Sequence, residues 1–204
     1  TGITIGSSNS GEGHIRFSDS DDADVGAIGY FHSSNYMNFR SDASEALRLT
    51  GQKLSTSAED SPDVSNGGLC LDQNANDTAI MTFKSSDIAH GMTSVAETDT
   101  WAKFTKESAA NGGLIIQSLT EGAGSEAFKV VGYVGGTSFN TGKSTSTSAI
   151  IEMSGAGSDG STGDADVGSN GNIMAVMNRN TVRFLFDAEG DFHADSSSTT
   201  FDAY

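Results

Sequence analysis

The sequence predicts an all-β fold, an elongated meander of short antiparallel strands and hairpins. Short runs rich in Val, Ile and Phe alternate with clusters of Gly, Ser, Asn and Asp, which is typical of strands joined by tight turns. The tetrapeptide Asn-Gly-Gly-Leu occurs at residues 66–69 and 111–114, with a looser copy at residues 170–173. The pattern of apolar residues leaves room for almost no helix.

In the first part of the chain, alternation of apolar and polar residues predicts one strand after another. Ile15 and Phe17 share one face of such a strand, and His14 and Arg16 share the other. Residues 50–66 are polar, contain the only proline and lack apolar periodicity. We therefore divide the chain into an N-terminal β-hairpin repeat segment, residues 1–61, and a larger β-rich segment, residues 62–204. The strands expected in the first segment are residues 3–5, 14–17, 25–31, 36–40 and 45–49.

The second segment predicts further strands separated by longer polar stretches. Residues 155–171 are a long run of Gly, Ser, Asp and Thr, which indicates an exposed or functional loop. Over residues 99–108 we expect a turn or two of helix, because Trp101 and Phe104 are spaced i, i+3. The strands expected here are residues 69–71, 79–83, 114–119, 127–134, 149–153, 173–177, 181–186 and 192–193.

The composition indicates that one chain alone buries too little apolar surface. Leu, Ile, Val and Phe together make up 39 of 204 residues, and the formal net charge is −16. We therefore expect a homo-oligomer, in which other copies of the chain supply the missing burial. The scattered Lys and Arg residues argue against nucleic acid as a partner. No apolar run is long enough for membrane insertion.

The sequence contains no recognisable catalytic or metal-binding motif, so we do not expect an enzyme. The four histidines are widely spaced, and no HExxH or Cys/His zinc pattern occurs. The single cysteine, Cys70, cannot form an intrachain disulfide and is expected to be a small buried apolar residue. The chain begins with Thr1 rather than Met, which we interpret as a fragment or a processed product.

An acidic run near the N-terminus is the one candidate for a metal ion. Asp19, Asp21, Asp22 and Asp24 pack carboxylates closely, as calcium loops do. The EF-hand pattern fails, however, because Asp24 and Tyr30 stand where a Gly and a Glu are required. A solvated turn and a weakly bound divalent cation, calcium, both remain open. No other cofactor is expected.

Two aromatic residues, Tyr36 and Trp101, are the candidates for stacking on a glycan. Tyr36 lies in an expected strand, where packing in a core or interface is the alternative role. Trp101 lies in the least strand-like part of the chain and is the better surface candidate.

Several motifs resemble a repeat of bacteriophage tail fibres and related virion appendages. In that family the repeat runs I-x-F-x-D, G-x-I-x-Y, M-x-F-R-T and R-L-R-I; here Ser41 replaces the usual Thr, and Leu49 ends the closing strand. The later part of the chain resembles tail fibres of marine phages. The motifs that carry the resemblance are residues 15–19, 25–30, 36–40, 46–49, 87–92, 96–100, 111–114 and 184–192.

The resemblance implies a structural and adhesive protein of the virion. It implies an intertwined homotrimer, a β-rich shaft or tip that joins other virion tail proteins and contacts a host surface glycan or protein. The family carries no catalytic residues to transfer to this chain. Two other functions stay open: a tailspike-type polysaccharide depolymerase, and a bacterial surface or filament structural protein.

Overall fold

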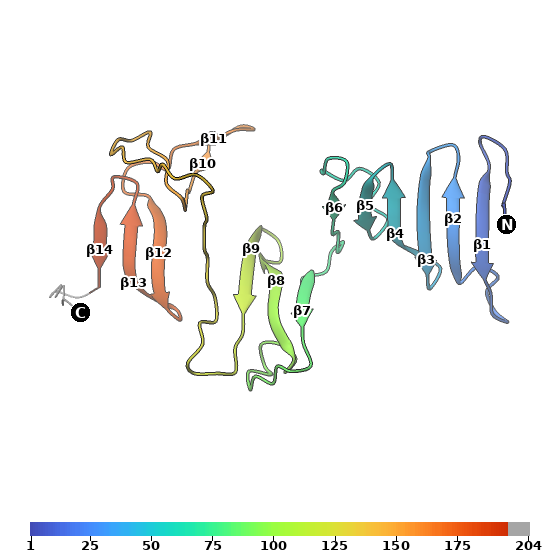
Figure 1. The fold of residues 1–204 in the computed structure, drawn as a ribbon, viewed down its shortest axis with the longest axis horizontal. Helices are drawn as coiled ribbons and strands as arrows, with labels where there is room; N and C mark the ends of the chain where they lie inside the picture. The colour runs from blue at the N-terminus through green and yellow to red at the C-terminus, as the bar shows by residue number, and fades with distance from the viewer. Residues whose placement is uncertain (196–204) are drawn as a thin grey trace. The chain divides into compact units, whose positions relative to one another are not determined.

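The computed structural model describes residues 1–195. The regular secondary structure in that range consists of β-strands, without a helix (Figure 1). Three sheets and one short hairpin form, built almost entirely of antiparallel pairs, and none of them closes into a barrel in the described range. The predicted all-β fold with antiparallel sheets is therefore confirmed. The chain divides into two compact units, Thr1–Lys129 and Val130–Tyr204.

The largest sheet has six strands in the order β1-β2-β3-β4-β5-β6, so each strand lies beside its neighbour in sequence. All pairs are antiparallel except β5 with β6, which is parallel. Strands β1 to β5 form the meander of hairpins that the turn residues predict. Its strands are β1 (Glu12–Phe17), β2 (Gly26–Phe31), β3 (Tyr36–Ser41), β4 (Ser44–Thr50), β5 (Lys53–Thr56) and β6 (Leu69–Cys70).

The hairpin between β3 and β4 shows how local backbone geometry sets the register. Ser41 pairs with Ser44, leaving a two-residue loop. Both loop residues, Asp42 and Ala43, have positive φ angles, 53° and 55°. Two successive left-handed residues make a type I′ turn, whose twist matches that of the flanking strands.

The remaining sheet of the first unit corrects one sequence expectation. It has the order β7-β8-β9, with β7 (Met81–Lys84), β8 (Thr100–Ser108) and β9 (Gly112–Ser118). The helix expected over residues 99–108 is wrong, because β8 is the central strand and pairs with neighbours on both sides. The i, i+3 spacing of Trp101 and Phe104 was misleading, since Thr, Trp and Phe also favour strands.

The second unit contains a short hairpin and a three-stranded sheet. The hairpin joins β10 (Gly157–Ser158) to β11 (Asp164–Ala165), and the sheet has the order β12-β13-β14. Its strands are β12 (Asn172–Asn178), β13 (Thr181–Asp187) and β14 (Phe192–Ala194). Strands were also expected at residues 3–5, 127–134 and 149–153, but these residues pair with no strand in the described range. A β-prone run becomes a strand only where a neighbouring edge accepts it.

The predicted division after residue 61 stays a prediction. The six-stranded sheet runs across it, because Leu54 of β5 pairs with Leu69 of β6. Residues 196–204 of the predicted second segment lie outside the described residues.

Very little apolar surface is buried. Among the described residues, the buried apolar side chains are Ala27, Pro62, Ala102 and Leu119. In contrast, large apolar side chains are exposed along nearly every sheet, for example Leu114, Val176 and Phe184. Within each unit, the described strands have close backbone neighbours only in their own sheet. Inside a unit, the described sheets therefore lack the packed second layer that gives most β domains their core.

Candidate functional sites

The first glycan candidate, Tyr36, lies near the start of β3 in a cluster of aromatic and charged side chains. Its ring stacks on Phe31 with ring centroids 4.5 Å apart, and the guanidinium carbon of Arg48 lies 4.3 Å from the Tyr36 ring centroid. A stacked ring and a cation both occupy π faces, so a sugar could stack on Tyr36 only by displacing one of them. Burial raises the pKa of the Tyr36 hydroxyl, which stays protonated and able to donate a hydrogen bond.

Beside Tyr36, a polar row crosses the six-stranded sheet. Asn38 is 3% exposed and donates from Nδ2 to Glu45 Oε2 at 2.7 Å, while Arg48 Nε donates to Glu45 Oε1 at 2.5 Å. The Glu45 hydrogen bond raises the pKa of Arg48, which fixes the guanidinium in its charged form. The Asn38–Glu45–Arg48 network therefore pins the orientation of the cation that covers the Tyr36 ring.

Two polar atoms of this row have no hydrogen-bond partner in the described part of the chain. They are Asn38 Oδ1 and His14 Nδ1, and both face Gly29, which is paired with both residues in the ladder. A Cβ at position 29 would lie 2.7 Å from His14 Nδ1 and 2.9 Å from Asn38 Oδ1. A larger residue at position 29 would therefore push His14 or Asn38 out of place, and glycine is the residue that leaves room for both side chains.

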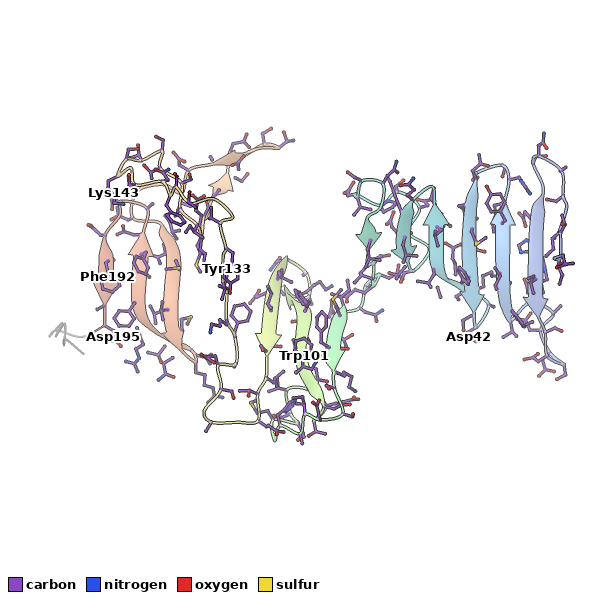
Figure 2. The ribbon with its side chains drawn as sticks, in the orientation of Figure 1. Asp42, Trp101, Tyr133, Lys143, Phe192 and Asp195 are labelled. Carbon is purple, nitrogen blue, oxygen red and sulfur yellow. The ribbon has the colours of Figure 1, made fainter. Side chains whose placement is uncertain are left out.

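The second glycan candidate, Trp101, lies on β8 in the other sheet of the first unit (Figure 2). Its side chain is 42% exposed and packs at a tilt against Phe83, with ring centroids 5.1 Å apart. Phe83 in turn contacts Phe104, at 6.0 Å between centroids. The structure does not bring Trp101 and Tyr36 together, because they lie in separate sheets. Trp101 offers more indole surface to a ligand than Tyr36 offers phenol surface.

The acidic run forms the loop between β1 and β2, and two of its carboxylates organise the loop itself. Asp19 Oδ1 accepts the backbone N–H groups of Asp21 and Asp22 at 2.9 and 2.8 Å, which lowers the pKa of Asp19. Asp24 Oδ2 accepts hydrogen bonds from Arg40 at 2.8 Å and from Arg16 at 3.4 Å. The Arg40 bond is the main reason that the pKa of Asp24 is lowered.

These contacts leave Asp21 and Asp22 as the freer carboxylates of the predicted calcium site. Asp22 Oδ1 accepts the backbone N–H of Asp24 at 2.9 Å, and Asp21 Oδ1 accepts the Ser20 hydroxyl at 3.3 Å. The calcium site stays a prediction, and the ion would compete with Arg40 and Arg16 for Asp24.

A third cluster, at the turn from β13 to β14, was missed in the sequence. One ligand atom from each of Asp187, Asp191 and His193 lies within 4.8 Å of the others, a mixed oxygen and nitrogen set that could hold a metal ion. Asp187 is buried, at 8% exposure, and its carboxylate is already engaged. Oδ1 accepts backbone N–H groups from Glu189 and Asp191 at 3.1 and 2.9 Å, and Oδ2 lies 2.8 Å from His193 Nε2.

The Asp187–His193 contact shifts both groups toward their charged forms. The hydrogen bond to Asp187 raises the pKa of His193, and the same bond, with the Asp191 backbone, lowers the pKa of Asp187. A cavity of about 480 Å³ lies on this side of the sheet, and the ion pair of Arg183 with Asp195 lines it. The cluster thus stabilises the turn between β13 and β14 through an ion pair and backbone hydrogen bonds. The spacing Asp-x-x-x-Asp-x-His was its only signal in the sequence.

No helix in the described residues is long and apolar enough to cross a membrane. In comparisons with known proteins, no family model, curated protein or solved structure matches the chain. The function is therefore inferred from the sequence motifs and the geometry above.

Proposed function

We propose that the chain is a structural and adhesive segment of a virion appendage, similar to a phage tail fibre, that assembles as a homotrimer and meets the host cell surface. The observation that carries the assembly is the burial deficit. Ala27, Pro62, Ala102 and Leu119 are the whole buried apolar set in residues 1–195, yet the chain adopts sheets. Sheets with so little core gain most of their stability when apolar faces meet other chains.

The virion location and the adhesive role are supported by the resemblance of the sequence motifs to tail fibres. The acidic surface also suits an exposed particle, because a net charge of −16 per copy limits unspecific association. Within this proposal Trp101 is the better glycan contact, since its indole is partly exposed and supported from one side by Phe83.

A glycan array with the full chain tests the adhesive role. The proposal expects retention of wild type on a subset of host-type glycans, weaker retention of Trp101→Ala, and unchanged retention of Phe17→Ala, an exposed aromatic control. Release of oligosaccharide from the array would instead support a depolymerase. Equal retention of wild type and Trp101→Ala would remove Trp101 from the contact, and no retention on any glycan would leave a protein receptor to be tested by binding to host cells.

A further inference from the structure

The second unit contains two apolar runs, residues 130–134 and 149–151, that lie side by side and outside any sheet. A Cβ on Gly132 would lie 2.9 Å from Ile150 Cγ2 and 3.2 Å from Ile151 Cγ1, so the glycine allows the two runs to approach closely. Every large apolar side chain in them is at least 46% exposed, and Tyr133 is 91% exposed. Such a patch on a monomer marks an interaction surface.

A groove of about 210 Å³ opens beside the two runs, between residues 134–140 and residues 148–150, and its chemistry matches an aromatic ring that carries a hydroxyl. An apolar cavity of about 150 Å³ is enough to hold benzene. The groove also has a polar side formed by Asn140 and Ser148, where a phenolic hydroxyl finds hydrogen-bond partners. Its apolar walls are Val134, Phe139, Ala149 and Ile150.

The charge pattern points to a second copy of the chain as the occupant. Residues 127–151 are the longest stretch of the sequence without an Asp or Glu, and they include Lys129 and Lys143. Copies that each carry −16 repel one another over most of their surface, and this stretch is where that repulsion is weakest. The stretch also contains both the groove and the most exposed tyrosine of the described residues.

We propose that Tyr133 of one copy inserts into the groove of the next copy. The inference rests on the proposed homotrimer and names the contact that builds it. Tyr133 does not line the groove of its own chain, so each copy presents a knob and a hole at separate positions. A knob-to-hole contact of this kind is heterologous, and it generates a ring when the rotation between copies closes. Three copies give three identical Tyr133 contacts, each burying about 150–250 Å² of the aromatic side chain.

Disulfide trapping between singly substituted chains tests the contact. Full-length Tyr133→Cys and Ile150→Cys chains, both carrying Cys70→Ser, are refolded together and oxidised with diamide. The inference expects a disulfide-linked dimer in the mixture and little in either chain alone. A chain that carries both Tyr133→Cys and Ile150→Cys is oxidised in parallel. A disulfide that forms within this doubly substituted chain, with none between the singly substituted chains, would place Tyr133 in the groove of its own chain and overturn the inference.

A dissociation measurement separates this inference from the proposed function. Analytical ultracentrifugation over a dilution series compares wild type with Tyr133→Ser and with the control Ile3→Ser, which removes an exposed apolar side chain elsewhere. We expect Tyr133→Ser to raise the midpoint concentration of dissociation at least tenfold, and Ile3→Ser to leave it within twofold. A wild-type trimer that Tyr133→Ser does not weaken overturns only the Tyr133 contact. A wild-type monomer at every concentration overturns the trimer and the contact together.

Discussion

His193 Nε2 lies 2.8 Å from Asp187 Oδ2, and this ion pair joins the end of β13 to β14 across the four-residue turn at residues 188–191. The other oxygen of Asp187, Oδ1, accepts the backbone N–H of Asp191 in that turn. The exposed imidazole, 57% accessible, therefore holds a buried carboxylate in place. Both pKa shifts favour the charged pair, so the stability of this hairpin depends on pH.

The ion pair predicts a window of pH in which the β13–β14 hairpin is most stable. The contribution of His193, whose pKa is raised, is complete below its ordinary value of 6.5 and is lost as the pH rises through the raised value. The contribution of Asp187, whose pKa is lowered, is complete above 3.8 and is lost as the pH falls through the lowered value. The window therefore extends from about pH 4 to about pH 6.5.

Titration of the His193 ring by NMR checks this prediction. In wild type the midpoint should lie above 6.5, and in Asp187→Asn it should fall toward 6.5 because the carboxylate charge is gone. An identical midpoint in the two proteins would show that Asp187 does not hold the imidazolium.

We predict that replacing Gly29 even with alanine lowers the stability of the fold. Gly29→Ala would place a methyl group within 2.9 Å of both His14 Nδ1 and Asn38 Oδ1, and Asn38 is held in place by Glu45. We expect a loss of about 1–3 kcal/mol in the free energy of unfolding, measured with urea. Gly91→Ala is the matched control, because nothing in the structure lies within 4 Å of a Cβ there. Equal stability of the two variants would refute the packing assigned to the row.

The turn between β3 and β4 predicts a stabilising substitution. Ala43 is left-handed, with φ of 55°, which costs an L-residue with a Cβ roughly 1–2 kcal/mol. Ala43→Gly removes that cost, and after the entropy penalty of glycine we expect a net gain of about 0.5–1 kcal/mol in unfolding free energy. In contrast, Ala46→Gly in β4 should lower stability, because its backbone belongs to a strand. A loss in both variants would contradict the type I′ turn.

Much of the six-stranded sheet could be predicted from the sequence, because alternation and turn residues act locally. The Asp42–Ala43 turn and the flanking strands are such a case. The contacts across the sheet could not be predicted, since the meeting of His14, Gly29 and Asn38 depends on the register of three strands. The strand at Trp101 was hidden by a spacing that suits a helix, and only its pairing on both edges settles the conformation.

The candidate sites divide in the same way. The acidic loop was visible in the sequence as a run of Asp residues. Its ion pairs from Asp24 to Arg16 and Arg40 could not be predicted, because they depend on how the strands pair in the folded sheet. The Asp187–His193 pair was missed because six residues separate its members and only the hairpin brings them together. Apolar residues 130–134 were predicted to be a strand, and the chain offers them no partner edge in the described range.

The engaged carboxylates of the acidic loop predict that calcium adds little to stability. Asp19 Oδ1 already accepts two backbone N–H groups and Asp24 Oδ2 already pairs with two arginines, so an ion would have to compete for half of each carboxylate. We expect the thermal midpoint to shift by less than about 2 °C between EDTA and millimolar calcium. A larger rise that disappears in the Asp21→Asn, Asp22→Asn double variant would establish the loop as a calcium site.

The central claim, that the chain completes its burial with two other copies, is tested most directly by the mass of the isolated chain in solution. Light scattering coupled to size exclusion, performed at micromolar concentration in moderate salt, should give three times 21.0 kDa, about 63 kDa. A stable, folded species of 21.0 kDa over the same concentrations would contradict the account.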